Sequence, residues 1–153
     1  MNKKKWIARG CTVAILLIAA AVMFVIGRGH TVYFDNKTAE YEGVEYAAFQ
    51  RVNVYVKGER AAKLGKRERG MATWIGQHFR MELEITENKG DEEKTVPVSI
   101  TLPFGMDGIV VNLPQLVAGL PQEVWQSEFI PAVPVEEEEE EIDTGEDIGL
   151  GDF

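Results

Sequence analysis

The chain of 153 residues has little of the chemistry that disulfides and metal sites need. Its one cysteine, Cys11, excludes an intrachain disulfide framework and a cysteine-rich zinc module. Two histidines, His30 and His78, leave little material for a histidine-based metal site. No serine–histidine–aspartate order and no phosphate-binding glycine-rich loop stands out. The length allows one domain with a tail and excludes a multidomain enzyme. We therefore expect a non-enzymatic protein without a metal or other cofactor.

Charges of one sign are missing from each end of the chain. Residues 1–10 hold four basic residues and no acid, whereas residues 136–153 hold ten acids and no base. The formal net charge of −9 is therefore mainly a property of the tail. Consecutive glutamates repel one another, and the tail has little apolar surface to bury, so we predict a disordered acidic tail over 136–153.

Charge is also absent from residues 11–26, a run of apolar and small residues. At about 1.5 Å per residue, a helix of this length approaches the ~30 Å hydrocarbon core of a bilayer. We predict a signal anchor, a transmembrane helix over 11–27 that contacts the lipid bilayer, after a cytoplasmic basic stub over 1–10. The excess of basic residues before this span predicts a single-pass protein of the cell membrane, with a cytoplasmic N-terminus and an extracytoplasmic C-terminal domain. The alternative is a cleaved signal peptide, although the small-residue pair Ala19 and Ala21 lies inside the apolar run.

Period-two hydrophobicity dominates the next part of the chain and predicts strands with one apolar face. The clearest runs cover 52–57, 79–85 and 95–102, with shorter ones at 31–34, 60–64, 71–74 and 109–111. Pro97 removes a backbone donor, which predicts an edge strand or a bulge. Asn112, Pro114 and Gly119 predict a short helical segment near 112–119. We expect a mainly β protein in which 28–135 form a small extracytoplasmic β-sandwich.

Two resemblances to known families also indicate an exported β domain. Residues 52–85 are similar to the PEGA-type β-modules of bacterial surface proteins, through the strand and glycine turn at Val56-Lys57-Gly58 and the Gly76-x-His78 step into an alternating strand. That resemblance implies an Ig-like or PEGA-like sandwich and no activity. The junction over residues 27–37 resembles the start of the exported part in an uncharacterised family of small bacterial single-pass membrane-anchored proteins, a family with a domain of unknown function.

A basic cluster lies between Lys57 and Arg69, in a segment that we interpret as a loop. Such a cluster can contact lipid headgroups or an acidic partner, or it can be simply solvated. Nucleic acid is not expected outside the cytoplasm, and no aromatic stacking pattern accompanies the cluster. The acidic tail is a further possible partner, as an intramolecular electrostatic latch. The candidate interaction residues in this cluster are Arg60, Lys63, Lys66, Arg67 and Arg69.

Apolar residues near the C-terminus form the second group of contact candidates. Residues 120–135 combine bulky side chains with prolines, and we expect them to lie across the domain or to contact a partner. The tail places apolar residues between acids, a pattern typical of segments that dock by coupled folding. The triplet Asp143-Thr144-Gly145 matches aspartic proteases, but its place after six glutamates favours a solvated tail. The candidates are Trp125, Phe129, Ile148, Leu150 and Phe153.

These patterns favour an anchored interaction or accessory module of a cell-envelope or transporter-associated complex, with a membrane or envelope protein as its partner. The alternative is an extracytoplasmic ligand-binding or sensing domain, which needs a concave apolar pocket. A hydrolase would need catalytic side chains gathered in space. A pocket of several hundred cubic ångströms would favour ligand binding, and a filled sandwich would favour a scaffold.

Overall fold

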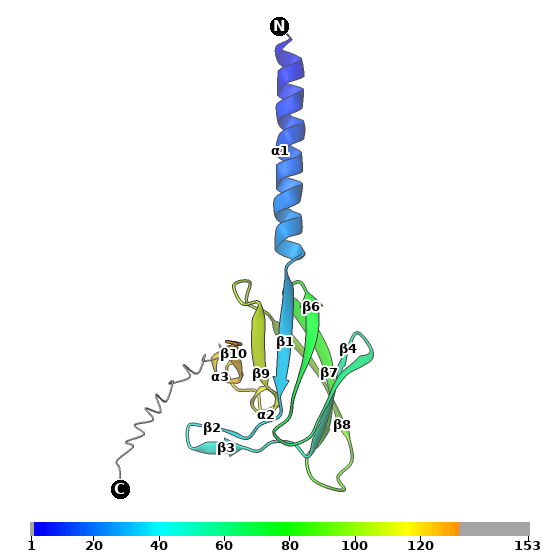
Figure 1. Ribbon diagram of the computed structural model, residues 1–153, viewed down its shortest axis with the longest axis vertical. Helices are drawn as coiled ribbons and strands as arrows, with labels where there is room; N and C mark the ends of the chain where they lie inside the picture. Colours follow the sequence, from blue (N-terminus) through cyan, green and yellow to red (C-terminus); the bar gives the residue numbers. More distant parts are fainter. Residues whose placement is uncertain (1, 132–153) are drawn as a thin grey trace, which may run out of the picture.

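A computed structural model of the chain describes residues 2–131. The chain forms one long N-terminal helix, ten strands and two short helices in this range (Figure 1). The predicted acidic tail over 136–153 lies outside the described residues. The elements are α1 (Lys3–Ile26), β1 (Gly29–Asp35), β2 (Ala39–Tyr41), β3 (Val44–Tyr46), β4 (Arg51–Val56), β5 (Glu59–Leu64), β6 (Arg69–Ile75), β7 (His78–Thr86), β8 (Lys94–Thr101), β9 (Gly108–Asn112), α2 (Leu113–Val117), α3 (Gln122–Trp125) and β10 (Gln126–Glu128).

The N-terminal helix is longer than the predicted span. α1 has 24 residues and begins at Lys3, so most of the predicted basic stub over 1–10 is helical. Lysine, arginine and alanine are strong helix formers, and Gly10 is the one weak position before the apolar run. By length and composition, α1 is able to cross a membrane, a property that a signal sequence shares. None of its residues is buried against the rest of the chain.

The strands form two four-stranded sheets and one separate hairpin. The first sheet has the order β10-β9-β1-β6, in which β1 runs parallel to β9 and antiparallel to β6. The second sheet is antiparallel throughout and has the order β5-β4-β7-β8. The mainly β prediction is therefore confirmed. The edge position of Pro97 is confirmed as well, because among the described strands β8 pairs with β7 alone.

One apolar core takes side chains from both sheets. Alternation along β7 buries Phe79, Met81, Leu83 and Ile85, as the sequence predicts. Phe34 of the first sheet is fully buried and stacks on Phe79 of the second, with ring centroids 6.0 Å apart. The other core members are Val32, Val52, Val54, Leu64, Ile100, Leu102, Ile109, Val111, Leu113 and Trp125.

β5 and β6 follow one another in the chain but belong to different sheets, and a glycine allows these two strands to come close. A Cβ added to Gly70 would lie 2.5 Å from Cβ of Ala62 and 3.1 Å from Cδ2 of Leu64. Both neighbours are held by their own strand, so they are unable to yield freely. Only glycine fits this position without a shift of the backbone.

We expect Gly70→Ala to lower the free energy of unfolding by about 1–3 kcal/mol, because the added methyl overpacks this contact. Chemical denaturation of the full chain in detergent micelles measures the loss. The double variant Ala62→Gly with Gly70→Ala removes the opposing Cβ and is expected to recover part of the loss. Gly105→Ala is the matched control, since a Cβ there meets no atom within 4 Å. Equal stability of Gly70→Ala and the control would contradict the close approach.

Residues 108–128 complete one edge of the first sheet with β9 and β10. The predicted helical segment is confirmed as α2: the side chain of Asn112 accepts a hydrogen bond from the backbone N–H of Gln115 at 3.1 Å, and Gly119 has a φ of +76° just after the helix. α3 and the edge strand β10 follow, and β10 pairs antiparallel with β9. Of the segment 120–135, residues 122–128 therefore lie against the domain, and residues 132–135 fall outside the described range.

Candidate functional site

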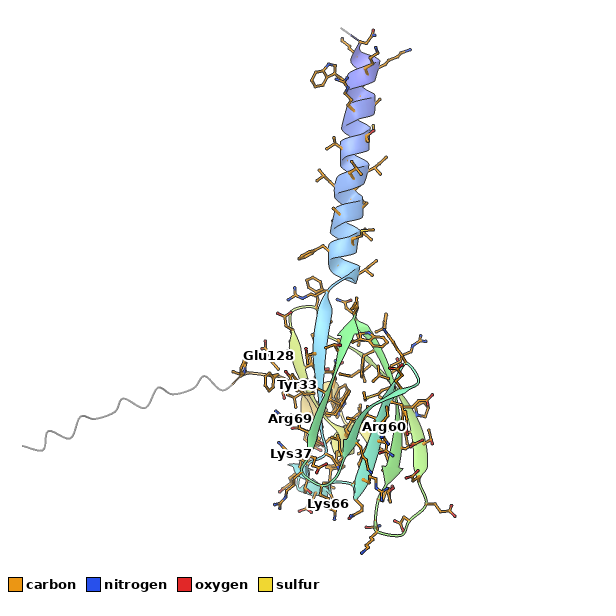
Figure 2. All side chains as sticks on the ribbon, turned by 45° about the vertical axis from the view of Figure 1, so that its right-hand side comes forward. Tyr33, Lys37, Arg60, Lys66, Arg69 and Glu128 are labelled. Atoms are coloured by element: carbon orange, nitrogen blue, oxygen red, sulfur yellow. The ribbon has the colours of Figure 1, made fainter. Side chains whose placement is uncertain are left out.

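The segment interpreted as a basic loop is a turn, the strand β5, a second turn and the start of β6. Arg60 and Lys63 lie on β5, Lys66 and Arg67 lie in the turn after it, and Arg69 begins β6. All five are exposed. The loop interpretation is therefore wrong, whereas the strand predicted over 60–64 is confirmed as β5, in which Leu64 is buried in the core and Ala62 packs against it. The cations are therefore distributed over β5, the turn after it and the start of β6, and Figure 2 shows Arg60 well apart from Arg69.

The second group of candidates also separates in space. Trp125 is 8% exposed and lies in the core, where its indole N–H donates a hydrogen bond to the carbonyl of Leu120 at 2.9 Å. We therefore leave Trp125 out of the candidate surface. Phe129 is half-buried on the surface beside β10, and Ile130 next to it is 79% exposed. Ile148, Leu150 and Phe153 lie outside the described residues.

Arg69 belongs to an ion cluster at the end of β1. Its guanidinium forms a bidentate pair with Asp35, with Nη2–Oδ2 at 2.7 Å and Nε–Oδ1 at 2.5 Å. The ammonium of Lys37 lies 3.4 Å from the same carboxylate. The Asp35 side chain is only 9% exposed, so two cations compensate one buried charge. Arg69 therefore has a structural role in addition to any contact with a partner.

The cluster changes the acidity of Asp35. Burial of the carboxylate by itself raises the pKa, but the hydrogen bond and charge of Arg69, with a smaller contribution from Lys37, hold the pKa below its ordinary value of 3.8. The ionised form is therefore favoured in the folded state. A depressed pKa contributes stability above the unfolded value of about 3.9, and this contribution is lost as the pH falls through the folded pKa.

We expect Asp35→Asn to lower the free energy of unfolding by about 1–3 kcal/mol at pH 7, because the charged hydrogen bonds are lost. The deficit relative to the wild type should shrink as the pH falls below about 4, where the wild-type carboxylate also takes up a proton. Denaturant midpoints across this pH range measure both effects. Asp91→Asn, on an exposed loop, is the control. A deficit that stays constant at low pH would contradict the role given to the Asp35 charge.

Aromatic side chains continue this cluster over the outer face of the first sheet. The rings of Tyr33 and Phe129 stack with centroids 4.2 Å apart, and the Arg69 guanidinium lies 5.8 Å from the Phe129 ring centroid. Met71 pairs with Tyr33 across β1 and β6 and is 61% exposed. Figure 2 shows Tyr33, Arg69 and Lys37 following one another along one side of the domain. We call the surface formed by Tyr33, Arg69, Met71, Phe129 and Ile130 the outer-face patch.

The junction between α1 and the domain is short and held by several contacts. Gly27 and Arg28 alone separate α1 from β1. The Arg28 side chain bonds Asp107 at 2.8 Å and lies over the Phe104 ring, 4.7 Å from its centroid. Phe104 also meets Phe24 of α1 edge-on, with centroids 6.5 Å apart. The loop before β9 therefore braces the end of the helix.

The two histidines lie in different surroundings, one buried and one exposed. His30 is 3% exposed, with Nδ1 2.7 Å from the carbonyl oxygen of Met106 in the bracing loop. Its Nε2 is buried and has no hydrogen-bond partner among residues 2–131. His78 is exposed at the start of β7. In the part of the chain that the structure describes, no group of three or more histidine, cysteine or acidic side chains is placed to hold a metal ion.

Sequence reasoning missed the most thoroughly bonded polar residue of the domain, Asn36. Its side chain is fully buried, with the amide N–H₂ donating to the carbonyls of Phe49 (2.9 Å) and Gly65 (2.8 Å) and the amide oxygen accepting from the Phe49 N–H (2.9 Å). It ties the end of β1 to two connections distant in sequence. The only local signal is a glycosylation-type triplet at 36–38, which carries no information about burial.

Surface hollows are present on both sheets. One of about 370 Å³ lies over the second sheet, lined by residues that include Tyr55, Lys57, Arg80 and Pro97. Another of about 410 Å³ lies between the end of the first sheet and the β4–β5 turn, lined by residues that include His30, Lys57, Trp74 and Ile75.

The structure thus defines a class: a mainly β domain carried directly on an N-terminal apolar helix. The chain belongs to a family of unknown function, DUF6672, whose model matches residues 1–150. No curated protein and no solved structure matches the chain.

Proposed function

We propose that the protein is a single-pass membrane-anchored, non-enzymatic interaction module. Residues 11–27 hold it in the bilayer, the N-terminus is cytoplasmic, and the β domain lies outside the cytoplasm in a cell-envelope or transporter-associated complex. The observation that carries the proposal is the joining of an apolar helix to a β domain through only two residues. In this proposal the β domain binds a partner, and the helix positions the domain at the membrane.

The surface of α1 supports the anchor. Its apolar side chains are exposed all round; Leu16 and Leu17, for example, are 63% and 66% exposed. A helix that is apolar on every side and unburied needs a non-aqueous surrounding. The basic residues before the apolar run and their scarcity just after it support a cytoplasmic N-terminus.

The arrangement of the two sheets supports a β-sandwich as the exported unit. Both sheets contribute to one core, and Phe34 and Phe79 meet across it. The segment similar to PEGA-type modules, 52–85, covers the strands β4 to β7. These observations are consistent with a small Ig-like or PEGA-like domain that carries contact surfaces on a filled core.

The outer-face patch is the surface that we propose for a membrane or envelope protein partner. Exposed Met71 and Ile130 lie beside the stacked rings of Tyr33 and Phe129, and aromatic residues, methionine and arginine are enriched at protein interfaces. The anchor keeps this patch near the bilayer, which raises its effective concentration for partners in the same membrane. Strong individual contacts are therefore not required.

Site-specific photo-cross-linking in native membranes tests this proposal. A photoreactive residue in place of Met71 is expected to cross-link one defined protein, identified by mass spectrometry, and a Tyr33→Asp substitution should abolish the adduct. The matched control carries the photoreactive residue in place of Ser99, which is exposed on the edge strand β8 of the other sheet. Removing residues 136–153 in a further arm asks whether the tail contributes. Equal labelling at Met71 and Ser99, or none at Met71, would overturn the interaction proposal.

The hollow of about 370 Å³ favours the second candidate function, an extracytoplasmic ligand-binding or sensing domain. Arg80 and Lys57 line this hollow with Tyr55 and one carboxylate, Glu82, so two cations against one acid suit a small anionic ligand. A screen of carboxylates and phosphates by thermal shift, repeated with Arg80→Ala, distinguishes the candidates. A shift that depends on Arg80 supports the sensing domain, and the absence of any shift removes it.

A further inference from the structure

The end of the β domain next to α1 is confined by the length of the connection. Two residues span at most about 7 Å when fully extended. The polar layer between the hydrocarbon edge and water is roughly 5–8 Å thick on each side of a bilayer. If α1 spans the bilayer as proposed above, the connection is no longer than this layer. The near end of the domain then lies among the lipid headgroups.

The contacts at the junction prevent the domain from swinging away. The Gly76 N–H donates to the carbonyl of Arg28 at 3.0 Å, so the β6–β7 turn is held at the level of the connection. On the other side, Phe104 packs against both Phe24 and Arg28. Figure 1 shows α1 standing on this end of the domain, with the β2–β3 hairpin at the opposite end.

The residues at this end have the character of a membrane interface. Ile75 ends β6 opposite Gly29, the first residue of β1, and is 68% exposed. Next to it, Trp74 carries the Lys57 ammonium over its ring, with Nζ 4.8 Å from the centroid. An apolar tip, an indole and a long cationic side chain are the types that settle at the headgroup level.

Ion pairing distinguishes the two cations at this end, Arg28 and Lys57. Arg28 is already paired with Asp107, whereas Lys57 forms no ion pair with any residue in the range 2–131. Lys57 also lines the hollow of about 410 Å³ together with Ile75 and His30. The Nε2 atom of His30 is buried there without a hydrogen-bond partner in the described chain. This hollow is thus lined by Lys57 and His30, and among residues 2–131 the Lys57 ammonium has no ion-pair partner and His30 Nε2 has no hydrogen-bond partner.

We propose that this end of the domain is a lipid-contact surface formed by Lys57, Ile75 and Phe104, with the half-buried Trp74 ring beneath the Lys57 ammonium. Ile75 and Phe104 lie at the boundary with the acyl chains, and Lys57 binds the phosphate of an anionic lipid headgroup at the mouth of the hollow. The proposal rests on the anchor under Proposed function. The lipid contact adds that the bilayer fixes the orientation of the domain. The outer-face patch then faces sideways, parallel to the membrane plane, toward proteins in the same membrane.

Depth-dependent quenching in vesicles tests the lipid contact. The full chain, with Cys11→Ser as background, is reconstituted into phosphatidylcholine vesicles with and without phosphatidylglycerol. A fluorophore is attached through Ile75→Cys or, as the matched control at the far end, through Glu92→Cys in the β7–β8 connection. A lipid with a nitroxide on its headgroup quenches labels in the headgroup layer. We expect several-fold stronger quenching at Ile75 than at Glu92, and a further increase with phosphatidylglycerol.

Charge reversal identifies the residue that binds the phosphate. Lys57→Glu is expected to remove the increase caused by phosphatidylglycerol, whereas Lys89→Glu, on the connection at the far end, leaves it intact. Carbonate extraction of the same vesicles separates the two proposals. Retention of the chain in the membrane with equal quenching at Ile75 and Glu92 would overturn the lipid contact while leaving the anchor in place. Release of the chain would overturn both.

Discussion

Replacing Asn36 by alanine is expected to lower the free energy of unfolding by about 3–5 kcal/mol, because three buried backbone groups lose their partner at once. The carbonyls of Phe49 and Gly65 and the N–H of Phe49 all bond the Asn36 amide, which is fully buried. Water has no access to replace these bonds. Single domains are stable by about 5–15 kcal/mol, so a loss of this size removes a large share of the stability.

Denaturant titration of the full chain in detergent micelles, followed by near-ultraviolet circular dichroism, measures this loss. Asn88→Ala is the matched control, because the Asn88 side chain bonds Asp91 in an exposed connection, and we expect a change below about 0.5 kcal/mol there. Asn36→Asp adds a second test. It places a carboxylate against two carbonyl oxygens, so its stability should rise as the pH is lowered. An Asn36→Ala variant as stable as the Asn88→Ala control would contradict the described hydrogen bonds.

Phe79→Ala is expected to have an effect of similar size, about 3–5 kcal/mol, through loss of buried area and creation of a cavity. Phe79 is fully buried, stacks on Phe34 of the first sheet and meets Trp74 edge-on, with centroids 5.2 Å apart. Its loss therefore removes contacts between the sheets in addition to those within β7. Hydrogen exchange should accelerate in β1 and β4 together, since the two sheets share one core.

Phe79→Leu is the conservative control for this core position, and it should lose less than half as much stability as Phe79→Ala because most of the volume is kept. Acceleration of exchange confined to the second sheet, with β1 unchanged, would show that the sheets unfold independently. That result would contradict the shared core and, with it, the support for a β-sandwich.

Local periodicity was enough to predict the longer strands. Along β4 and β7, apolar residues alternate with polar ones, and the structure buries Val52, Val54, Phe79 and Leu83 accordingly. The cap of α2 is equally local, because Asn112 bonds the backbone only three residues on. Features set by neighbouring residues in the sequence are therefore predictable from the sequence alone.

The missed elements depend on distant partners. β10 has three residues and is a strand only because Val110 and Val111 of β9 lie beside it. The strands Ala39–Tyr41 and Val44–Tyr46 form a hairpin, and three residues each are too few positions to show a period. The loop interpretation of the basic segment is wrong for a related reason, because Ala62 packs against the core and Leu64 is buried in it.

The candidate surfaces were still harder to predict. The outer-face patch brings Tyr33 and Phe129 together from positions 96 residues apart in the sequence, through the pairing of β1, β9 and β10. Trp125 carries the same aromatic signal as Phe129, but lies in the core. Composition does not separate an aromatic core residue from a surface one, because the packing of α3 and β10 against the rest of the domain decides which side each ring faces.

Thiol labelling tests the central claim, that α1 is an uncleaved anchor which places the β domain outside the cytoplasm. In a Cys11→Ser background, single cysteines at Lys4 and at Met71 are treated with a membrane-impermeant maleimide in intact cells that produce the chain, and the mass of the labelled chain is recorded. We predict labelling of Met71→Cys in intact cells, labelling of Lys4→Cys only after lysis, and a chain of full mass in the membrane fraction. Labelling of Lys4→Cys in intact cells, or loss of the N-terminal segment from the chain carrying Met71→Cys, would contradict the account.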